Sequence, residues 1–192
     1  MKYFFSDTHF GDDRLGINGK PNVFFRPFNS VREQNDTMLS NIIGILGKDC
    51  TELYCIGDII IDLNTESYLK YIKDKFPQVE MILIKGNYDV GKLEMLSKYF
   101  DTIVDSMIIT IGNKKLFLNH YPVKCKEFLE NDATIDFAIT GHIHSLWKVQ
   151  PKMVNVSVDA WHFKPVSEEE ILFIINGCDK HYDANVFPYI KK

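Results

Sequence analysis

Five short apolar runs recur along this chain, and polar residues follow each of them. The runs are rich in β-branched and aromatic residues, which is typical of buried strands, and they cover residues 3–5, 53–56, 81–84, 116–118 and 137–139. The residues that follow them are Ser6-Asp7-Thr8-His9, Gly57-Asp58, Lys85-Gly86-Asn87, Asn119-His120 and Thr140-Gly141-His142-Ile143-His144. Ligands gather at the carboxyl ends of strands in layered α/β folds. We therefore expect these strand ends to converge on one site.

The segments between the runs predict helices and hairpins. Ser30 followed by Glu33 is a capping-box pattern, and it precedes apolar residues at the helical positions 38, 39, 42, 43 and 46. Further helices are expected from Asn64 or Thr65 and over about residues 92–99. Residues 108–111 with 116–118, and 145–150 with 153–158, read as hairpins. Strands that alternate with helices first and form hairpins later predict a mixed α/β layered domain.

The length of 192 residues fits one domain, which we expect to span residues 1–192. A chain of this length buries a sizeable core, so it needs neither disulfides nor a structural metal merely to fold. The stretch 177–192 is polar, and we expect it to be a loosely packed tail.

Net charge and cysteine content indicate which classes of protein and which cell compartment fit the sequence. The net charge of −4 argues against a protein that coats nucleic acid, because such proteins cluster Lys and Arg. An anionic substrate stays compatible with it, since bound divalent cations would invert the sign of a cleft. The four cysteines form no C-x-x-C pair, and reduced cysteines are typical of the cytosol. No signal peptide or membrane-spanning run is visible, so we expect a cytoplasmic protein.

Each polar residue at a strand end has an ordinary explanation when it is taken alone. An aspartate after a strand is usually a turn or cap residue, a lone histidine is more often a buried partner, and alternate histidines can be one face of an exposed strand. Their recurrence in this order after five runs favours a metal site instead. The predicted ligands are Asp7, His9, Asp58, Asn87, His120, His142 and His144.

The ligand types indicate which metals the site prefers. Imidazole, carboxylate and amide groups without thiolate suit manganese, iron, zinc, cobalt or nickel better than calcium or magnesium. Among these metals we expect manganese. Seven side chains exceed the needs of one ion, so we expect two ions with a shared ligand, roughly 3.5–4 Å apart.

These motifs, in this order, resemble those of the calcineurin-like metallophosphoesterase family. The resemblance covers residues 3–175, nearly the whole chain. The stretches 25–28, 155–161 and 165–167 are similar to the compact single-domain bacterial and phage branch of that family. The resemblance implies a fold of two packed mixed β-sheets flanked by helices. It also implies in-line attack of a metal-bound hydroxide on a phosphate ester.

The resemblance assigns a role to each predicted ligand. It implies that Asp7, His9 and His144 bind the first metal, and that Asp58 bridges both metals. The second metal would be bound by Asn87, His120 and His142, so that Asp58, Asn87 and His120 belong to the catalytic centre. Two such cations lower the pKa of bound water and stabilise the leaving oxygen.

The third motif departs from the family pattern. The family commonly has histidine after the asparagine, and this histidine donates a proton to the leaving alcohol; here the motif is Gly86-Asn87-Tyr88-Asp89. Many relatives also place an aspartate three residues after the bridging one, where this chain has Ile61. General acid help is worth about 10²–10⁴-fold, and Tyr, with a reference pKa near 10, is a poorer donor. We therefore expect a preference for phosphodiesters or easily released alcohols.

Two classes of function stay open at this point. One is a phosphoesterase, a hydrolase that acts on a small phosphorylated substrate such as a nucleotide or short oligonucleotide; the absence of a basic stripe argues against duplex nucleic acid. The other is a scaffold with little or no catalysis, like the metallophosphoesterase-like subunit of retromer, which also lacks the histidine. Retention of a complete ligand set favours the enzyme.

Three residues are candidate substrate contacts, and a fourth is expected to hold a loop of the site in place. Arg26 is either a phosphate clamp or a surface ion pair, because guanidinium binds phosphate oxygens in bidentate fashion. Tyr88 is expected to hydrogen-bond the leaving oxygen. Tyr121 either lines the cleft or begins a helix. Asp89 is expected to support the Asn87 loop through backbone hydrogen bonds.

Overall fold

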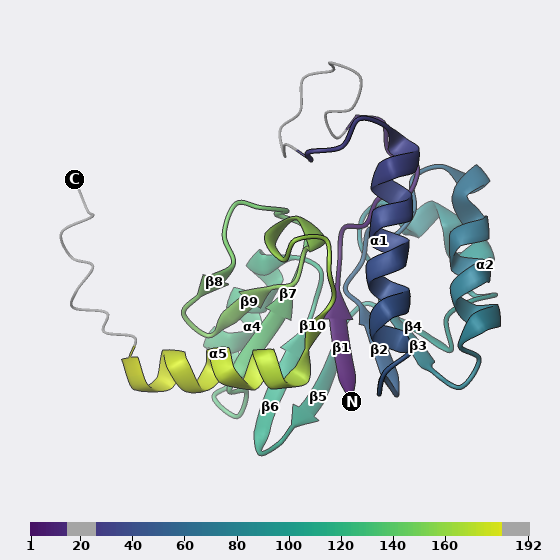
Figure 1. Ribbon diagram of the computed structural model, residues 1–192. Helices are drawn as coiled ribbons and strands as arrows, with labels where there is room; N and C mark the ends of the chain where they lie inside the picture. The colour runs from purple at the N-terminus through teal and green to yellow at the C-terminus, as the bar shows by residue number, and fades with distance from the viewer. Residues whose placement is uncertain (15–25, 182–192) are drawn as a thin grey trace.

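The computed structural model describes residues 1–14 and 26–181, whose strands form two five-stranded sheets (Figure 1). The first sheet has the order β10-β1-β2-β3-β4 and the second the order β5-β6-β7-β9-β8. The first comprises β1 (Lys2–Phe5), β2 (Glu52–Cys55), β3 (Glu80–Ile84), β4 (Thr102–Val104) and β10 (Val166–Ser167). The second comprises β5 (Met107–Ile111), β6 (Lys114–Leu118), β7 (Phe137–Thr140), β8 (Val149–Gln150) and β9 (Met153–Asn155).

Both sheets are mixed, as the sequence predicts. In the first sheet β1, β2, β3 and β4 are parallel and β10 is antiparallel to β1. In the second sheet β6, β7 and β9 are parallel, while β5 and β8 join as antiparallel hairpin partners. The five predicted apolar runs are β1, β2, β3, β6 and β7. Because they are parallel within each sheet, their carboxyl ends share one edge.

Side chains of β1 show how the two cores are separated. Tyr3 and Phe5 point into the core that the first sheet shares with its helices, whereas Phe4 points into the core between the two sheets. Successive strand residues face opposite sides of a sheet, and a strand buried on both sides is apolar throughout. This explains why the central strands read as continuous apolar runs.

Helices cover the outer faces of the sheets and one end of the core (Figure 1). The core outside the first sheet includes residues of α1 (Val31–Leu46), α2 (Glu66–Lys75) and α3 (Leu93–Leu96). The second sheet is covered by α4 (Pro122–Asn131), where Phe128 stacks on Phe117 with ring centroids 3.9 Å apart. Helix α5 (Glu168–His181) contributes Ile171 and Ile175 to the core between the sheets.

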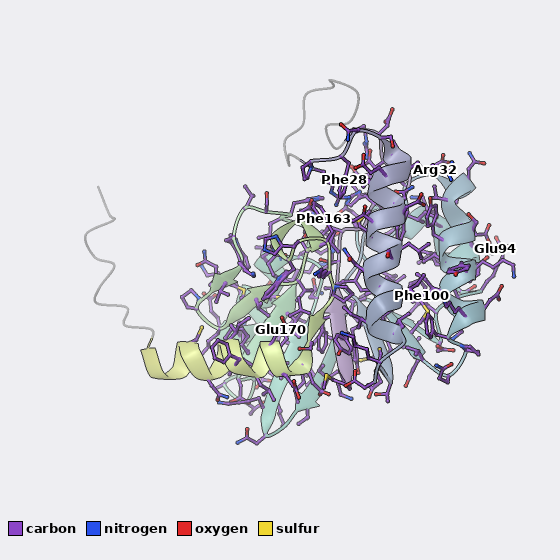
Figure 2. All side chains as sticks on the ribbon, in the orientation of Figure 1. Phe28, Arg32, Glu94, Phe100, Phe163 and Glu170 are labelled. Carbon is purple, nitrogen blue, oxygen red and sulfur yellow. The ribbon has the colours of Figure 1, made fainter. Side chains whose placement is uncertain are left out.

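The N-terminus of α1 is built as the capping-box pattern predicts, with one difference. The Ser30 side chain accepts a hydrogen bond from the Glu33 backbone N–H at 3.1 Å. The Glu33 carboxylate accepts from the backbone N–H of Asn29, one residue earlier than the pattern implies. Ahead of this cap, Phe28 lies against Phe163 with ring centroids 4.8 Å apart, which ties the start of α1 to the loop before β10 (Figure 2).

Several predicted elements differ from those in the structure. The helix expected over residues 92–99 is a 3-10 turn, η3 (Val90–Lys92), followed by α3, because Tyr99 and Phe100 turn into the core. The second hairpin pairs only residues 149–150 with 153–154. The short strands β4 and β10 were not predicted. Residues 177–181 continue α5 instead of beginning a loose tail, and residues 182–192, like Phe25, lie outside the described residues.

In the described ranges 1–14 and 26–181, no helix combines the length and apolar character needed to span a bilayer.

Candidate metal centre

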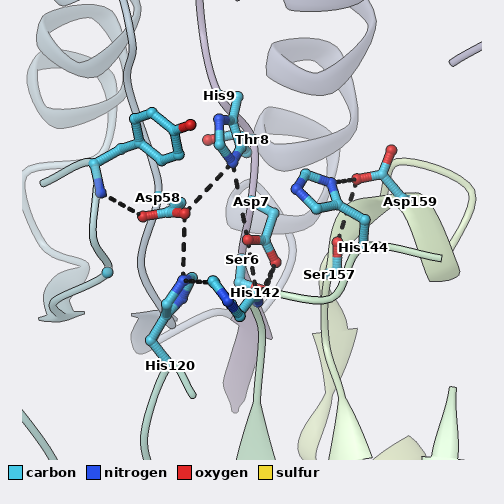
Figure 3. A network of polar contacts seen from close by, with 12 residues as sticks. Ser6, Asp7, Thr8, His9, Asp58, His120, His142, His144, Ser157 and Asp159 are labelled. Atoms are coloured by element: carbon cyan, nitrogen blue, oxygen red, sulfur yellow. Dashed lines mark hydrogen bonds and ion pairs between the residues drawn. The ribbon is translucent and has the colours of Figure 1, made fainter. Parts of the chain in front are cut away.

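Six of the seven predicted ligands meet at the shared edge of the two sheets, in two groups of three (Figure 3). Asp7, His9 and His144 form the first group. Asp58, His120 and His142 form the second. In each group the possible ligand atoms lie within 4.8 Å of one another. The family resemblance implies the same division of these six residues.

One oxygen atom joins the two groups. Asp58 Oδ2 lies 3.6 Å from His9 Nε2, in the first group, and 3.3 Å from His120 Nε2, in the second. The other oxygen, Oδ1, accepts a hydrogen bond from the Tyr88 backbone N–H at 2.9 Å. Asp58 therefore occupies the position that a bridging carboxylate needs.

The backbone at this edge adopts a rare conformation. Eight non-glycine residues in the described ranges have a positive φ, and the five among them that are predicted ligands are Asp7, His9, Asp58, His142 and His144, with φ between 47° and 74°. Such a backbone costs about 1–3 kcal/mol per residue and persists only where the surroundings impose it. Clusters of this kind occur at functional sites.

Hydrogen bonds between loops impose this geometry. The Asp7 carboxylate accepts from the Ser6 hydroxyl at 2.7 Å and from the His142 backbone N–H at 3.0 Å, so it links β1 to the loop after β7. The Ser6 backbone N–H donates to the Val156 carbonyl, which connects the end of β1 to the second sheet. The strand ends of both sheets are thus held against one another.

Asp89 supports the Asn87 loop, as predicted. Its buried carboxylate accepts from the backbone N–H groups of Asp58, Ile59 and Gly86 at 2.8, 3.1 and 2.8 Å. Burial raises the pKa of Asp89, and these hydrogen bonds oppose that shift. Asn87 itself is exposed at the tip of this loop. The loop is tied to the bridging residue, whereas metal binding by Asn87 stays a prediction.

The residues present fit a bound cation. His9 is buried, and neither of its ring nitrogens has a hydrogen-bond partner, yet its Nε2 faces the carboxylates of Asp7 and Asp58 at 3.9 and 3.6 Å. Burial lowers the pKa of His120, but its hydrogen bond to Asp58 and the nearby charge of Asp7 outweigh burial and raise the pKa to about 9. The centre therefore attracts positive charge, and its unpaired nitrogen suits a metal ion.

Two histidines are oriented by partners on the side away from the centre. His120 Nδ1 lies 2.7 Å from the Ile56 carbonyl, so that Nε2 faces Asp58. His144 Nδ1 lies 2.7 Å from Asp159 Oδ2. Metal-binding histidines usually donate their second N–H to a carboxylate or carbonyl in this way.

Comparisons with known proteins bear on the fold that carries this site. No family model matches the chain. An uncharacterized protein of Methanocaldococcus jannaschii is 26% identical over 183 residues, which cover 90% of each chain. A solved protein of unknown function from Aquifex aeolicus has 29% identity and a TM-score of 0.69, covering 91% of this chain and 98% of that one. A solved archaeal phosphodiesterase has 18% identity and a TM-score of 0.52, with 81% of each chain covered.

The chain has the calcineurin-like metallophosphoesterase fold. The predicted fold class, with two mixed sheets flanked by helices, is thereby confirmed. In this metallophosphoesterase fold the two Asp/His groups are residues that could hold metal ions.

Arg26 corrects one expectation about substrate contacts. Its guanidinium is buried and pairs with Asp159 through Nε at 2.7 Å and Nη2 at 2.9 Å. Further donors reach the backbone carbonyls of Thr8 and Asp7 at 2.9 and 2.5 Å. Arg26 is therefore neither a surface ion pair nor a clamp open to substrate in this structure. Arg26 supports the first ligand group through Asp159, which contacts His144.

The two tyrosines flank the centre. The Tyr88 ring lies 5.0 Å from the His9 ring, beside the first group. The Tyr121 ring lies 5.0 Å from His120 and 5.1 Å from His142, beside the second group. Tyr121 also precedes α4 as its N-cap residue, which agrees with the reading that it begins a helix. Their contact with substrate stays a prediction.

Sequence reasoning missed two carboxylates that contact the histidines from behind. Asp159 contacts His144, and Asp12 Oδ2 lies 3.4 Å from His9 Nδ1. Asp12 is three residues from His9, a short spacing that could have indicated it. Asp159 is fifteen residues from His144, and no local pattern links them. Asp62, by contrast, caps the 3-10 turn η2 (Leu63–Thr65) and takes no part in the centre.

Proposed function

We propose that the chain is a metal-dependent phosphoester hydrolase that uses two divalent transition-metal ions, with manganese preferred. The observation that carries this proposal is the position of Asp58 Oδ2 within 3.6 Å of His9 Nε2 and 3.3 Å of His120 Nε2, which joins two ligand groups into one centre. The archaeal phosphodiesterase that shares the fold supports the same reaction class.

The side chains divide the work of the proposed reaction. Asp7, His9 and His144 would hold one ion, while His120, His142 and Asn87 would hold the other, with Asp58 shared. Divalent cations, when bound, lower the pKa of water and neutralise charge on phosphoryl oxygens. Asp159 and the Ile56 carbonyl keep His144 and His120 turned toward the centre. Fixed ligands of this kind need no rearrangement during the reaction.

We further propose that phosphodiesters are preferred. Tyr88 stands where relatives carry the acid histidine, so proton donation to a poor leaving group is weak. The test compares bis(4-nitrophenyl) phosphate with 4-nitrophenyl phosphate, because both release the same alcohol. We expect faster turnover of the diester. Equal or faster turnover of the monoester would overturn this preference.

Replacing the bridging residue tests the hydrolase itself. With manganese-loaded protein and a panel of monoesters, linear diesters and cyclic nucleotides, Asp58→Asn should lower kcat/KM by roughly 100-fold or more, since even outer partners of metal ligands are worth 10–100-fold. Asp36→Asn is the matched control, because Asp36 pairs with Arg32 on the exposed face of α1. Wild-type protein without turnover under every metal would contradict the proposal.

A scaffold role is the second candidate, and one surface feature favours it. A groove of about 470 Å³ lies between β8 and α5, and its lining includes Val149, Trp161 and Phe173. Phe173 is 79% exposed and Val149 37%, so apolar side chains of this groove face solvent. If the chain is a scaffold, Asp58→Asn should leave partner binding intact while no ester is hydrolysed.

A further inference from the structure

Two histidines of the first ligand group each contact an aspartate that is paired with an arginine. Each set of arginine, aspartate and histidine is called an array below. In one, Arg26 holds Asp159 by two hydrogen bonds and Asp159 contacts His144. In the other, Arg14 holds Asp12 through Nε and Nη2, both at 2.9 Å, and Asp12 lies 3.4 Å from His9 Nδ1. The two arrays contain the same residue types, but the Asp12–His9 contact is the longer one, at 3.4 Å against 2.7 Å between Asp159 and His144.

The arrays differ in how their arginines meet solvent. The Arg26 side chain is fully buried, whereas 56% of the Arg14 side chain is exposed. Orientation of a histidine does not require an exposed cation, as Arg26 demonstrates. Asp12 accepts hydrogen bonds from Nε and Nη2 of Arg14, and the Tyr88 side chain is a further hydrogen-bond partner of this guanidinium. Arg14 thus combines a fixed position with an accessible charge.

Arg14 lies on the side of the centre where Tyr88 replaces the acid histidine. The Arg14 Cζ atom is 5.2 Å from the centroid of the Tyr88 ring, and that ring is 5.0 Å from His9. A second cation is close by, because Lys92 Nζ donates to the Tyr88 carbonyl at 2.5 Å. Arg14 and Lys92 thus place two cationic groups against Tyr88, in a chain with a net charge of −4, and cationic groups attract anions.

We propose that Arg14 forms an anion subsite on the Tyr88 side of the metal centre, which binds a second phosphate group of the substrate. This inference rests on the proposed phosphoesterase function. Arginine fits phosphate because its guanidinium presents several donors in a fixed plane. The substrate class is a phosphate ester with a neighbouring phosphate, as in a short oligonucleotide. The two hydrogen bonds to Asp12 fix the position of the guanidinium when the subsite is empty.

Equilibrium binding tests the subsite without relying on turnover. Thymidine 3′,5′-bisphosphate and the two thymidine monophosphates are titrated into manganese-loaded protein by calorimetry. We expect the bisphosphate to bind wild-type protein about tenfold more tightly than either monophosphate, which is the scale of one charge-assisted hydrogen bond. Arg14→Gln should abolish this preference. Arg32→Gln, an exposed arginine that also pairs with an aspartate, should retain it.

The ratio of affinities separates the subsite from indirect damage. If Arg14→Gln merely weakened metal loading through Asp12 and His9, both ligands would bind more weakly and the ratio would stay unchanged; that result overturns the proposal. So does a wild-type protein without preference for the bisphosphate. A preference that depends on Arg14 in a protein that hydrolyses no ester would refute the proposed reaction and leave the subsite standing.

Discussion

Glycine residues beside the ligands determine how closely the loops approach. A Cβ atom built on Gly86 would lie 2.2 Å from Asp58 Oδ1 and 2.6 Å from the Asp58 backbone nitrogen. A Cβ atom on Gly141 would lie 2.4 Å from Ser6 Oγ and 2.9 Å from Asp7 Oδ2. At both positions the metal centre itself occupies the space of a side chain. Glycine is therefore required by contact with the ligands.

The clash at Gly86 predicts a specific loss. Gly86→Ala should displace Asp58 and weaken manganese binding by about tenfold or more, the scale found when the support of a ligand is removed. Gly91→Ala, in the 3-10 turn η3 that follows this loop, is the control, since nothing lies within 4 Å of a Cβ atom there. Metal titration followed by calorimetry measures both variants. Equal affinities for the two variants would contradict the steric argument.

Asp159 offers a second test at the scale of single residues. Asp159→Asn removes the charge that faces both Arg26 and His144, so we expect manganese affinity to fall about 10–100-fold. Stability should also fall, by about 3–5 kcal/mol, because a buried guanidinium loses its ionic partner. Urea unfolding and metal titration measure the two effects. Asp74→Asn, in an exposed pair with Lys70 on α2, should change neither, and wild-type values for Asp159→Asn would refute the role of this array.

Helix α1 contacts the loop that precedes it, and this loop carries ligands of the centre. Helix α1 presents the buried Asn35 side chain, which accepts from the Gly11 backbone N–H at 3.3 Å in the loop after β1. The start of this helix depends on Ser30, whose side chain caps the Glu33 N–H. An element outside the centre thereby holds a loop that carries two ligands.

The cap of α1 predicts a modest change in stability. Ser30→Ala should lower the free energy of unfolding by about 1 kcal/mol, because a helix N–H loses its acceptor. Ser40→Ala, at an exposed position inside the same helix, should cost nothing or slightly stabilise, since alanine is the better helix former. Urea denaturation compares the two. Equal losses would show that the Ser30 hydroxyl does not act as a cap.

Element prediction succeeded where local patterns were strong. The central strands are apolar on both faces, and the cap at Ser30 is a local signal, so both were predicted from neighbouring residues. Strand β10 has two residues and forms only because β1 offers an edge to Val166 and Ser167. Strand β4 depends likewise on pairing with β3. Such strands form only through pairing with strands distant in the sequence, so no local pattern predicts them.

At the scale of the whole molecule, the candidate metal centre lies where the two sheets meet. Asp7, His9 and Asp58 follow strands of the first sheet, whereas His120, His142 and His144 follow strands of the second. Any ion held by both sets links the sheets across their shared edge. Metal binding should therefore stabilise the fold as a whole.

This link predicts a metal-dependent melting temperature. Manganese at about one hundred times its Kd should add about 2.7 kcal/mol, which for a chain of this size raises Tm by roughly 5–10 °C. Calorimetry with manganese and with a chelator measures the difference. Asp58→Asn, which removes the shared ligand, should show a much smaller shift. An unchanged Tm at saturating manganese would mean that the ion does not bind across both sheets.

The order of polar residues after apolar runs was sufficient to predict the central strands and the meeting of their polar ends at one site. Those inferences depend on local periodicity and on the shared edge of parallel strands, both of which are encoded in short stretches. The two packed mixed sheets and the division of six ligands into two groups were predicted from the family resemblance instead. The contacts of Arg26, Asp159 and Arg14 were decided by tertiary structure alone. Arg26 and Asp159 are 133 residues apart, and only the folded core brings them together. Whether an arginine clamps a carboxylate inside the core or stays accessible depends on burial, which no spacing in the chain specifies.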